Sequence, residues 1–307
     1  MNTVFHVVAI EKIQFFLQKV VLPNQLSSGG KNPFMTSFLN NIFVANEEAR
    51  LHSSDLSIQR GYGVFDFLRT VNAQPLFLQH HLDRFFQSAQ AMHLQPQHTK
   101  EELTQIIHEL IHRSQLKEAG IRLLLTGGYS PDTYHTTTPN LLITCNPVTT
   151  STRELFEKGF SIITYEHQRE LPHIKSINYL MAVWLHPLLK EKKVDDVLYH
   201  HNNCVTEFPR ANVFAVTKEN KLVTPARNML KGITRKFVLQ QAPTWIEVEE
   251  RDLTVEELIN ASEVFLTSTT KRVIPVISVD GRTIGNGKAG RITRQLWECL
   301  MQLEKQS

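Results

Sequence analysis

The segment from His173 to Phe214 constrains the fold of this chain more than any other. It contains a lysine, Lys175, which follows Leu171-Pro172 and has apolar neighbours. Burial among apolar groups disfavours the charged form of an amine and lowers its pKa. A neutral amine can attack a carbonyl carbon and form a Schiff base. A fold that buries this segment therefore carries a reactive lysine, whereas a fold that exposes it carries an ordinary charged surface residue.

The same segment contains an acidic residue, Glu207, between two runs of strand-forming residues. The second run begins at Asn212 and is rich in β-branched and aromatic side chains, so we predict that Glu207 lies at a strand end or in a turn. A carboxylate there can hold a proton on the nitrogen of a pyridine ring, which turns the ring into an electron sink. Most glutamates in turns are solvated surface groups, so only the motifs around Glu207 support a functional role for it.

Length and composition narrow the class of protein. A chain of 307 residues is long for one hydrophobic core and comfortable for two domains. Its hydrophobic fraction of 41% and charged fraction of 21% are typical of a soluble globular protein. The net charge of +3 comes without a block of lysines and arginines, so nucleic acid is not expected as a partner.

The cysteines and the hydropathy indicate the cellular compartment in which the chain acts. Cys145, Cys204 and Cys299 lie far apart, without the paired spacing of a zinc site or a disulfide framework. We therefore expect no metal and a reducing, cytoplasmic environment. No apolar run approaches the roughly 20 residues that a membrane-spanning helix needs, so no membrane association is expected.

The chain divides into three parts and a linker. Residues 1–34 combine an apolar run, interrupted by charges, with a linker-like stretch, and we interpret them as an N-terminal extension or as the product of an upstream start codon. We predict a smaller α/β domain over residues 35–147 and a larger domain over residues 154–307. The polar residues 148–153 lack periodicity and are predicted to link the two domains.

The first domain is predicted to alternate strands and helices. A hairpin turns at Asn40-Asn41, and a strand over residues 61–70 is followed by another over residues 76–78. Helical spacing of apolar residues predicts helices over residues 81–93 and 101–116. Further strands are expected over residues 121–125 and 140–144.

The second domain is predicted to begin with a strand over residues 160–164. A helix over residues 179–190 is expected to turn Leu180, Val183, Trp184 and Leu188 inward. Residues 232–235 precede a helical run, and the free N–H groups at a helix start form a natural anion site. Helices over residues 256–261 and 291–303 complete the chain.

Five blocks of sequence, taken in order, resemble one known family. They are His80-His81-Leu82-Asp83-Arg84, Ile174-Lys175-Ser176-Ile177-Asn178-Tyr179, Val205-Thr206-Glu207 with Asn212-Val213-Phe214, Leu230-Lys231-Gly232-Ile233-Thr234-Arg235, and Thr267-Ser268-Thr269-Thr270 with Ile274-Pro275-Val276. In this order and spacing the chain resembles the class IV, fold type IV, pyridoxal-phosphate enzymes. That family includes branched-chain aminotransferases, D-amino-acid aminotransferases and aminodeoxychorismate lyases. The likeness runs from Ser37 to the last helix.

The resemblance implies a two-domain α/β (α+β) fold of type IV, with an N-terminal α/β sandwich domain and a C-terminal pseudo-barrel α/β domain. It also implies pyridoxal 5′-phosphate bound as a Schiff base on Lys175, with Glu207 on the pyridine nitrogen and Tyr179 near the ring hydroxyl. The phosphate would be held by four residues, Arg84, Ile233, Thr234 and Thr269. A homodimer with active sites close to the subunit interface is expected on the same ground.

The substrate is less constrained by the resemblance. Phe65, Arg122 and Thr270 match positions that line the substrate pocket in the family, and Arg122 falls where branched-chain enzymes have an arginine. Lys175 and Tyr179 are one residue closer than in those enzymes, which looks like the D-amino-acid group. That group carries an arginine near the position of Gly127, which argues against it.

We therefore favour an aminotransferase that exchanges the amino group between a branched-chain type of amino acid and a 2-oxo acid. The alternatives are a D-amino-acid aminotransferase, an aminodeoxychorismate lyase and a non-catalytic relative that kept the fold. The run Phe208-Pro209-Arg210 replaces the glycine and small residues usual in the family. Its bulk is expected to narrow the pocket or to place Arg210 near a substrate carboxylate.

Overall fold

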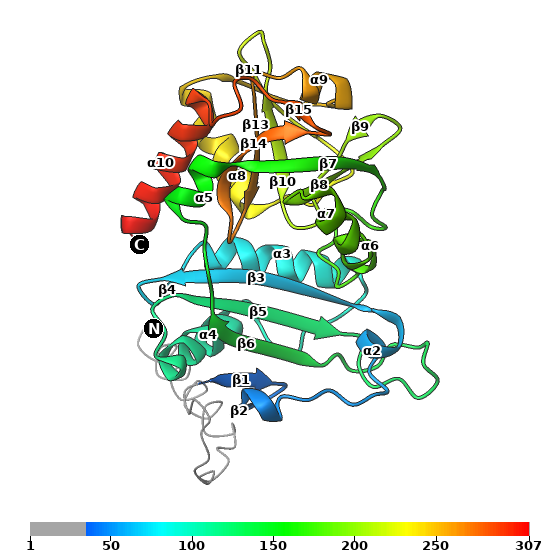
Figure 1. Ribbon diagram of the computed structural model, residues 1–307. Helices are drawn as coiled ribbons and strands as arrows, with labels where there is room; N and C mark the ends of the chain where they lie inside the picture. Colours follow the sequence, from blue (N-terminus) through cyan, green and yellow to red (C-terminus); the bar gives the residue numbers. More distant parts are fainter. Residues whose placement is uncertain (1–34, 307) are drawn as a thin grey trace, which may run out of the picture.

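Two β-sheets, one in each half of the chain, form the framework of the molecule (Figure 1). The computed structural model describes residues 35–306, so the predicted extension over residues 1–34 lies outside the described part. Strands and helices are mixed in both halves, as the α/β prediction requires. The chain passes from the first sheet to the second between Pro147 and Arg153, and we propose this segment as the domain boundary.

The first sheet is antiparallel throughout and has the strand order β2-β1-β6-β5-β3-β4. The predicted hairpin is present, with its turn at Asn40 in the left-handed region (φ 54°). The strands are β1 (Thr36–Leu39), β2 (Ile42–Ala45), β3 (Gly63–Val71), β4 (Gln74–Pro75), β5 (Ala119–Thr126) and β6 (Leu141–Pro147).

Helices pack on this sheet through the apolar faces that the sequence pattern predicts. Phe85 and Leu103 are fully buried in one core with strand residues such as Ile121. Thr99 and Glu102 form a reciprocal capping box, which explains why the longest of these helices begins there. The elements are η1 (Asn46–Glu48), α2 (Leu56–Arg60), α3 (Leu78–Ala91) and α4 (Lys100–Ser114).

The second sheet is mixed, with the strand order β12-β11-β10-β13-β14-β7-β8-β9 and with β15 paired to β14. Its pairs β7–β8, β7–β14 and β11–β12 are parallel. The strands are β7 (Phe160–Glu166), β8 (Asp196–His201), β9 (Cys204–Val205), β10 (Asn212–Val216), β11 (Lys221–Thr224), β12 (Glu247–Glu250), β13 (Glu263–Ser268), β14 (Arg272–Val279) and β15 (Arg282–Thr283).

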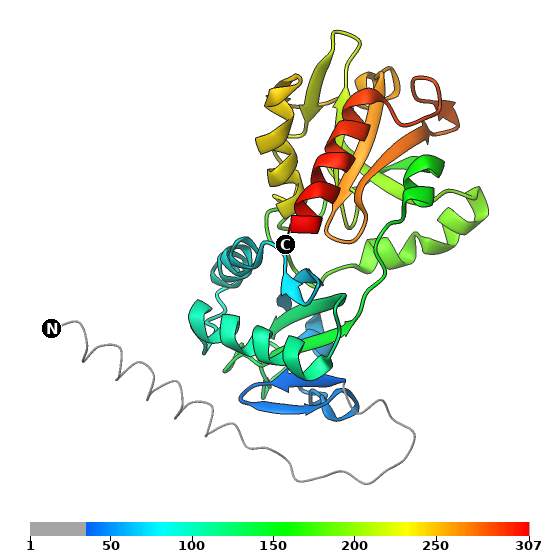
Figure 2. The same cartoon turned by 90° about the vertical axis from the view of Figure 1, so that its left-hand side faces the viewer.

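Two longer helices cover this sheet and lie side by side (Figure 2). Phe237 of α8 (Ile233–Gln241) and Leu296 of α10 (Arg291–Gln306) belong to the same buried core as Phe214 and Phe265 of the strands. The shorter elements are α5 (Arg153–Lys158), α6 (Leu180–Trp184), α7 (His186–Lys192), η2 (Ala242–Thr244) and α9 (Val255–Ile259).

Two of our local predictions are wrong. The expected strand over residues 76–78 is absent, because β4 ends at Pro75 and α3 already begins at Leu78. The expected helix over residues 179–190 is split into α6 and α7 next to Pro187. Three of its four expected inward residues, Leu180, Val183 and Trp184, are exposed instead. Across residues 35–306, no helix combines the length and the apolar character needed to span a bilayer.

Candidate active site

Two adjoining cavities lie where the two halves of the chain meet. The first is lined by seven residues that we predicted for cofactor binding, namely Arg84, Lys175, Tyr179, Glu207, Ile233, Thr234 and Thr269. The second is lined by the three predicted substrate residues, Phe65, Arg122 and Thr270. Lys175, Tyr179, Arg210, Ser268 and Thr269 line both cavities, so the lysine stands at their junction.

The backbone around Lys175 is fixed against the first sheet. Its carbonyl oxygen accepts from the Phe65 N–H at 2.9 Å, and the Ile177 N–H donates to the Gly63 carbonyl at 3.1 Å. The Lys175 N–H donates to the Ser88 hydroxyl of α3 at 3.2 Å. Residues 175–177 therefore lie along β3 like a short extra strand, although they precede α6 of the second half.

The Lys175 amine is held in an environment that disfavours its charge. Burial lowers the pKa of Lys175 to about 7, and the nearby Arg84 guanidinium acts in the same direction. The carboxylates of Asp66 and Glu207 oppose this shift without cancelling it. The Lys175 Nζ lies 4.5 Å from the centroid of the Phe65 ring. Near neutral pH a large fraction of this amine is therefore uncharged and nucleophilic.

We predict that this pKa governs how fast the cofactor-free protein reacts with pyridoxal 5′-phosphate. Only the neutral amine attacks, so the rate is expected to rise with pH, reach half its maximum near pH 7 and then level off. Stopped-flow absorbance across a pH series measures this rate, with free N-acetyl-lysine as the reference for ionisation of the cofactor's own groups. A rate that still climbs above about pH 9, as for an ordinary lysine, contradicts the assignment.

Glu207 occupies the predicted strand end, between β9 and β10, and is 4% exposed. Its carboxylate accepts from Arg169 Nε at 2.7 Å and from the Leu230 N–H at 3.0 Å. Burial raises the pKa of Glu207, while these two donors pull in the opposite direction. Arg169 also lines the first cavity. No motif marks Arg169, so our sequence reasoning missed it.

Arg84 projects from α3 and is oriented by a carboxylate of β3. The Arg84 Nε and Nη2 atoms both donate to Asp66, each at 2.8 Å. His81, one turn earlier, contacts the same carboxylate through Nδ1 at 2.7 Å. Burial alone would raise the pKa of Asp66, but Arg84 and His81 hold it well below its ordinary range. The signal for Asp66 was an acidic residue between two phenylalanines, Phe65 and Phe67, in a predicted strand, and we did not use it.

The start of α8 presents free N–H groups to the first cavity. Gly232 is the N-cap residue and has no side chain to bond these groups, so they remain available for an anion. A Cβ on Gly232 would stand 2.1 Å from Asn212 Oδ1, which explains the glycine. The buried Thr267 Oγ1, which belongs to a residue lining this cavity, has no hydrogen-bond partner among the described residues.

The second cavity combines aromatic walls with two guanidinium groups. The Arg122 guanidinium carbon lies 4.4 Å from the centroid of the Phe65 ring, and the Phe65 and Tyr179 ring centroids are 5.8 Å apart. Within residues 35–306, neither Arg122 nor Arg210 forms an ion pair with a carboxylate. Both are close enough to oppose the burial that raises the pKa of Tyr179. The cavity can therefore accept a carboxylate.

The Lys175 amine stands at the junction of an anion-binding cavity and an aromatic, cationic cavity. The first cavity suits a phosphorylated carbonyl cofactor, and the second suits a carboxylate substrate. Comparison with known proteins agrees, because residues 63–279 match the family model for amino-transferase class IV. A D-alanine aminotransferase from Staphylococcus haemolyticus is 31% identical over 277 residues, covering 85% of this chain and 95% of that protein. The chain belongs to the class IV aminotransferases.

Solved structures show the same fold. The branched-chain amino acid aminotransferase of Escherichia coli superimposes with a TM-score of 0.82 at 24% identity, covering 87% of this chain and 94% of that chain. A branched-chain amino acid aminotransferase of T.th., solved with pyridoxamine 5′-phosphate, gives a TM-score of 0.81 at 24% identity, covering 91% and 95%. The fold type IV prediction is confirmed.

Class IV aminotransferases use pyridoxal 5′-phosphate, and the residues of the first cavity fit this group. The uncapped start of α8 suits a phosphate, and the buried carboxylate of Glu207 suits a protonated ring nitrogen. The unpartnered Thr267 hydroxyl offers a further polar contact. The Lys175 amine suits an aldehyde, because its lowered pKa leaves it nucleophilic.

Proposed function

We propose that this chain transfers the amino group between an amino acid of the branched-chain type and a 2-oxo acid, with Lys175 as the catalytic residue. The observation that carries the proposal is the position of Lys175 at the junction of the two cavities, with its pKa lowered to about 7. When bound, pyridoxal phosphate supplies an electrophilic carbon for amines and a ring that accepts electron density from the substrate Cα.

The lysine and the glutamate divide the proton chemistry between them. The Lys175 amine would take the proton from the substrate Cα as a general base and, once protonated, would return it as a general acid. Glu207 keeps a proton on the ring nitrogen, and Arg169 holds that carboxylate in place. Tyr179 lines both cavities, and we assign it to the ring hydroxyl of the bound cofactor.

The first cavity would also hold the cofactor phosphate. Arg84, Ile233, Thr234 and Thr269 are the proposed contacts, and the two hydrogen bonds that Arg84 donates to Asp66 fix the orientation of its guanidinium. A charge-assisted arginine contact together with helix N–H groups is a combination that suits a dianion. By holding the phosphate, these residues would fix the position of the cofactor relative to Lys175.

The second cavity supports a branched-chain substrate. Phe65, Phe67 and Ile177 give it an apolar wall that suits an aliphatic side chain. Arg122, Arg210 and Thr270 are the groups proposed to receive the carboxylate. Arg210 comes from the run Phe208-Pro209-Arg210, in which Phe208 is fully buried, so the bulk of the phenylalanine lies in the core.

A D-alanine aminotransferase is the second candidate. The observation that favours it is the 31% identity to the D-alanine enzyme of Staphylococcus haemolyticus over nearly the whole length of both chains. The two candidates differ in the face of the substrate that Lys175 must reach and in the size of the side chain. In an apolar pocket, one extra or missing methylene group changes kcat/KM by about 10- to 200-fold.

We also propose that the chain forms a homodimer and acts in the cytoplasm. The exposed apolar residues of α6, Leu180, Val183 and Trp184, support a dimer because large apolar groups rarely cluster on a free surface. Among the described residues, all three cysteines are free thiols, in keeping with a reducing compartment.

A half-reaction panel tests the substrate. The protein loaded with pyridoxal phosphate is mixed with L-valine, L-leucine, L-isoleucine, D-alanine, D-glutamate or aminodeoxychorismate, and the loss of the lysine-bound absorbance band is followed. We expect L-leucine or another branched-chain L-amino acid to react at least about tenfold faster than D-alanine. Faster reaction of D-alanine would establish the second candidate, and pyruvate release from aminodeoxychorismate without a 2-oxo acid would establish a lyase.

A further inference from the structure

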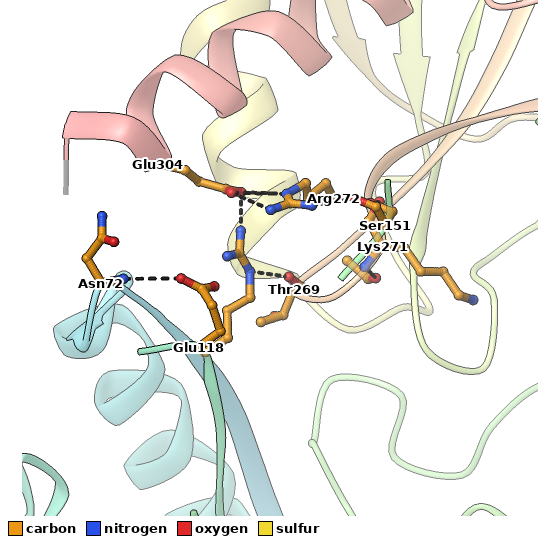
Figure 3. Close-up of polar contacts among 9 residues, drawn as sticks. Asn72, Glu118, Ser151, Thr269, Lys271, Arg272 and Glu304 are labelled. Carbon is orange, nitrogen blue, oxygen red and sulfur yellow. Dashed lines mark hydrogen bonds and ion pairs between the residues drawn. The ribbon is translucent and has the colours of Figure 1, made fainter. Parts of the chain in front are cut away.

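A buried ion cluster outside the two cavities joins distant parts of the chain (Figure 3). Glu304, in the last turn of α10, is 3% exposed and accepts from Arg272 of β14, with Nε–Oε1 and Nη2–Oε2 distances of 2.9 and 2.7 Å. Arg69 of β3 pairs with the same Oε1 atom. The Arg69 Nε then donates to the carbonyl oxygen of Thr269 at 2.9 Å. The cluster thus connects both sheets with the last helix.

The second arginine of the cluster reaches the same turn through Ser151. The Arg272 Nη1 donates to the Ser151 carbonyl at 2.5 Å. Ser151 itself donates its N–H to the Thr270 carbonyl at 3.0 Å and its hydroxyl to the Lys271 carbonyl at 2.7 Å. All three consecutive carbonyl oxygens of the turn between β13 and β14, at residues 269–271, are therefore held by donors from outside the turn.

This arrangement matters because the turn lines both cavities. Carbonyl oxygens repel an anion, whereas hydroxyl and N–H groups bind it, and a trans peptide points its C=O and N–H in opposite directions. Fixing the carbonyls in the cluster keeps them from turning towards a bound phosphate beside Thr269. Arg272 also has a left-handed backbone (φ 59°), which is uncommon for a residue with a side chain. Its side chain is paired with Glu304.

We propose that Glu304 is a positioning residue for the phosphate end of the cofactor site, acting through Arg69 and Arg272 on the turn at residues 269–271. The inference rests on the proposed function, because it assigns Thr269 to the cofactor phosphate. It adds a role for the C-terminal helix, which contributes no residue to either cavity.

The test compares two ligands that differ only in the phosphate, pyridoxal 5′-phosphate and pyridoxal. Their dissociation constants for the cofactor-free protein are measured by absorbance for the wild type, Arg69→Met and Glu304→Gln. Glu304→Gln leaves two guanidinium groups without their carboxylate, and this variant can fail to fold. Arg69→Met removes the bond to Thr269 but keeps the Arg272–Glu304 pair, which is neutral overall. It therefore tests the inference even if Glu304→Gln does not fold. Glu157→Gln, which breaks the Arg294 ion pair at the other end of α10, is the matched control.

We expect both variants to bind pyridoxal phosphate about tenfold more weakly, while pyridoxal binding changes less than about twofold and Glu157→Gln resembles the wild type. Equal weakening of both ligands would indicate a general loss of structure and overturn the inference, as would unchanged binding of pyridoxal phosphate. A wild type that binds the two ligands equally well overturns the proposed phosphate site itself, and the inference with it.

Discussion

Lys175→Ala is expected to lower the rate of amino transfer by more than about 10⁴-fold, the largest effect of any single substitution in this chain. The alanine removes the amine that we propose both to react with the cofactor aldehyde and to move the substrate proton. The lysine-bound absorbance band disappears as well, although the phosphate contacts remain in place. Steady-state assays with the amino acid that the half-reaction panel selects provide the measurement.

The matched control for this variant is Lys231→Ala, because Lys231 is an exposed lysine that immediately precedes Gly232 of the first cavity. It is expected to keep most of the activity and the absorbance band. If Lys175→Ala retains more than about a hundredth of the wild-type rate, the lysine does not perform the proton transfer. A band that survives in Lys175→Ala but is lost in Lys231→Ala would move the reactive amine to the other lysine.

Glu207→Gln is expected to reduce kcat by about 10²–10³-fold, with little change in how tightly pyridoxal phosphate binds. The glutamine keeps the shape of the side chain and an oxygen for the Leu230 N–H, but it loses the charge that holds a proton on the ring nitrogen. Carbanion stabilisation therefore falls, while the phosphate contacts stay. Single-turnover absorbance measurements separate the chemical step from binding.

Stability must be separated from chemistry in this variant. The substitution leaves the Arg169 guanidinium without its carboxylate, which costs about 3–5 kcal/mol for a buried pair. The double variant Arg169→Gln, Glu207→Gln removes both charges, so it is expected to regain thermal stability but not activity. Glu207→Asp keeps the charge and should retain at least about tenfold more activity than Glu207→Gln. Recovery of activity in the double variant would show that Glu207 serves only the fold.

Much of the fold was predictable because its local signals agree with its tertiary contacts. The hairpin at Asn40-Asn41, the capped helix that begins after Thr99 and the strands β5, β6 and β7 all lie where periodicity and turn residues place them. The failures have a physical reason. The apolar spacing of Leu180, Val183 and Trp184 predicts a helix with one apolar face, but spacing alone does not say what that face meets.

The site was predictable to the extent that short sequence blocks carry its chemistry. All ten predicted residues line at least one of the two cavities, although they come from different parts of the fold. Arg84 lies within α3 and Phe65 within β3, whereas Ile233 and Thr234 open α8. The residues that orient them were not predicted. Arg169 and Asp66 contact Glu207 and Arg84 across long stretches of sequence. No local pattern distinguishes Arg169 from a surface charge, and the position of Asp66 between two phenylalanines does not by itself name its partner.

The most direct test of the central claim is to identify the lysine that bonds to the cofactor. The full chain is incubated with pyridoxal 5′-phosphate and reduced with borohydride, which converts the linkage into a stable secondary amine, and the proteolytic peptides are examined by mass spectrometry. The modification is expected on Lys175, in the peptide that contains this residue. A modification confined to another lysine, or none under conditions that reduce the visible band, would contradict the account.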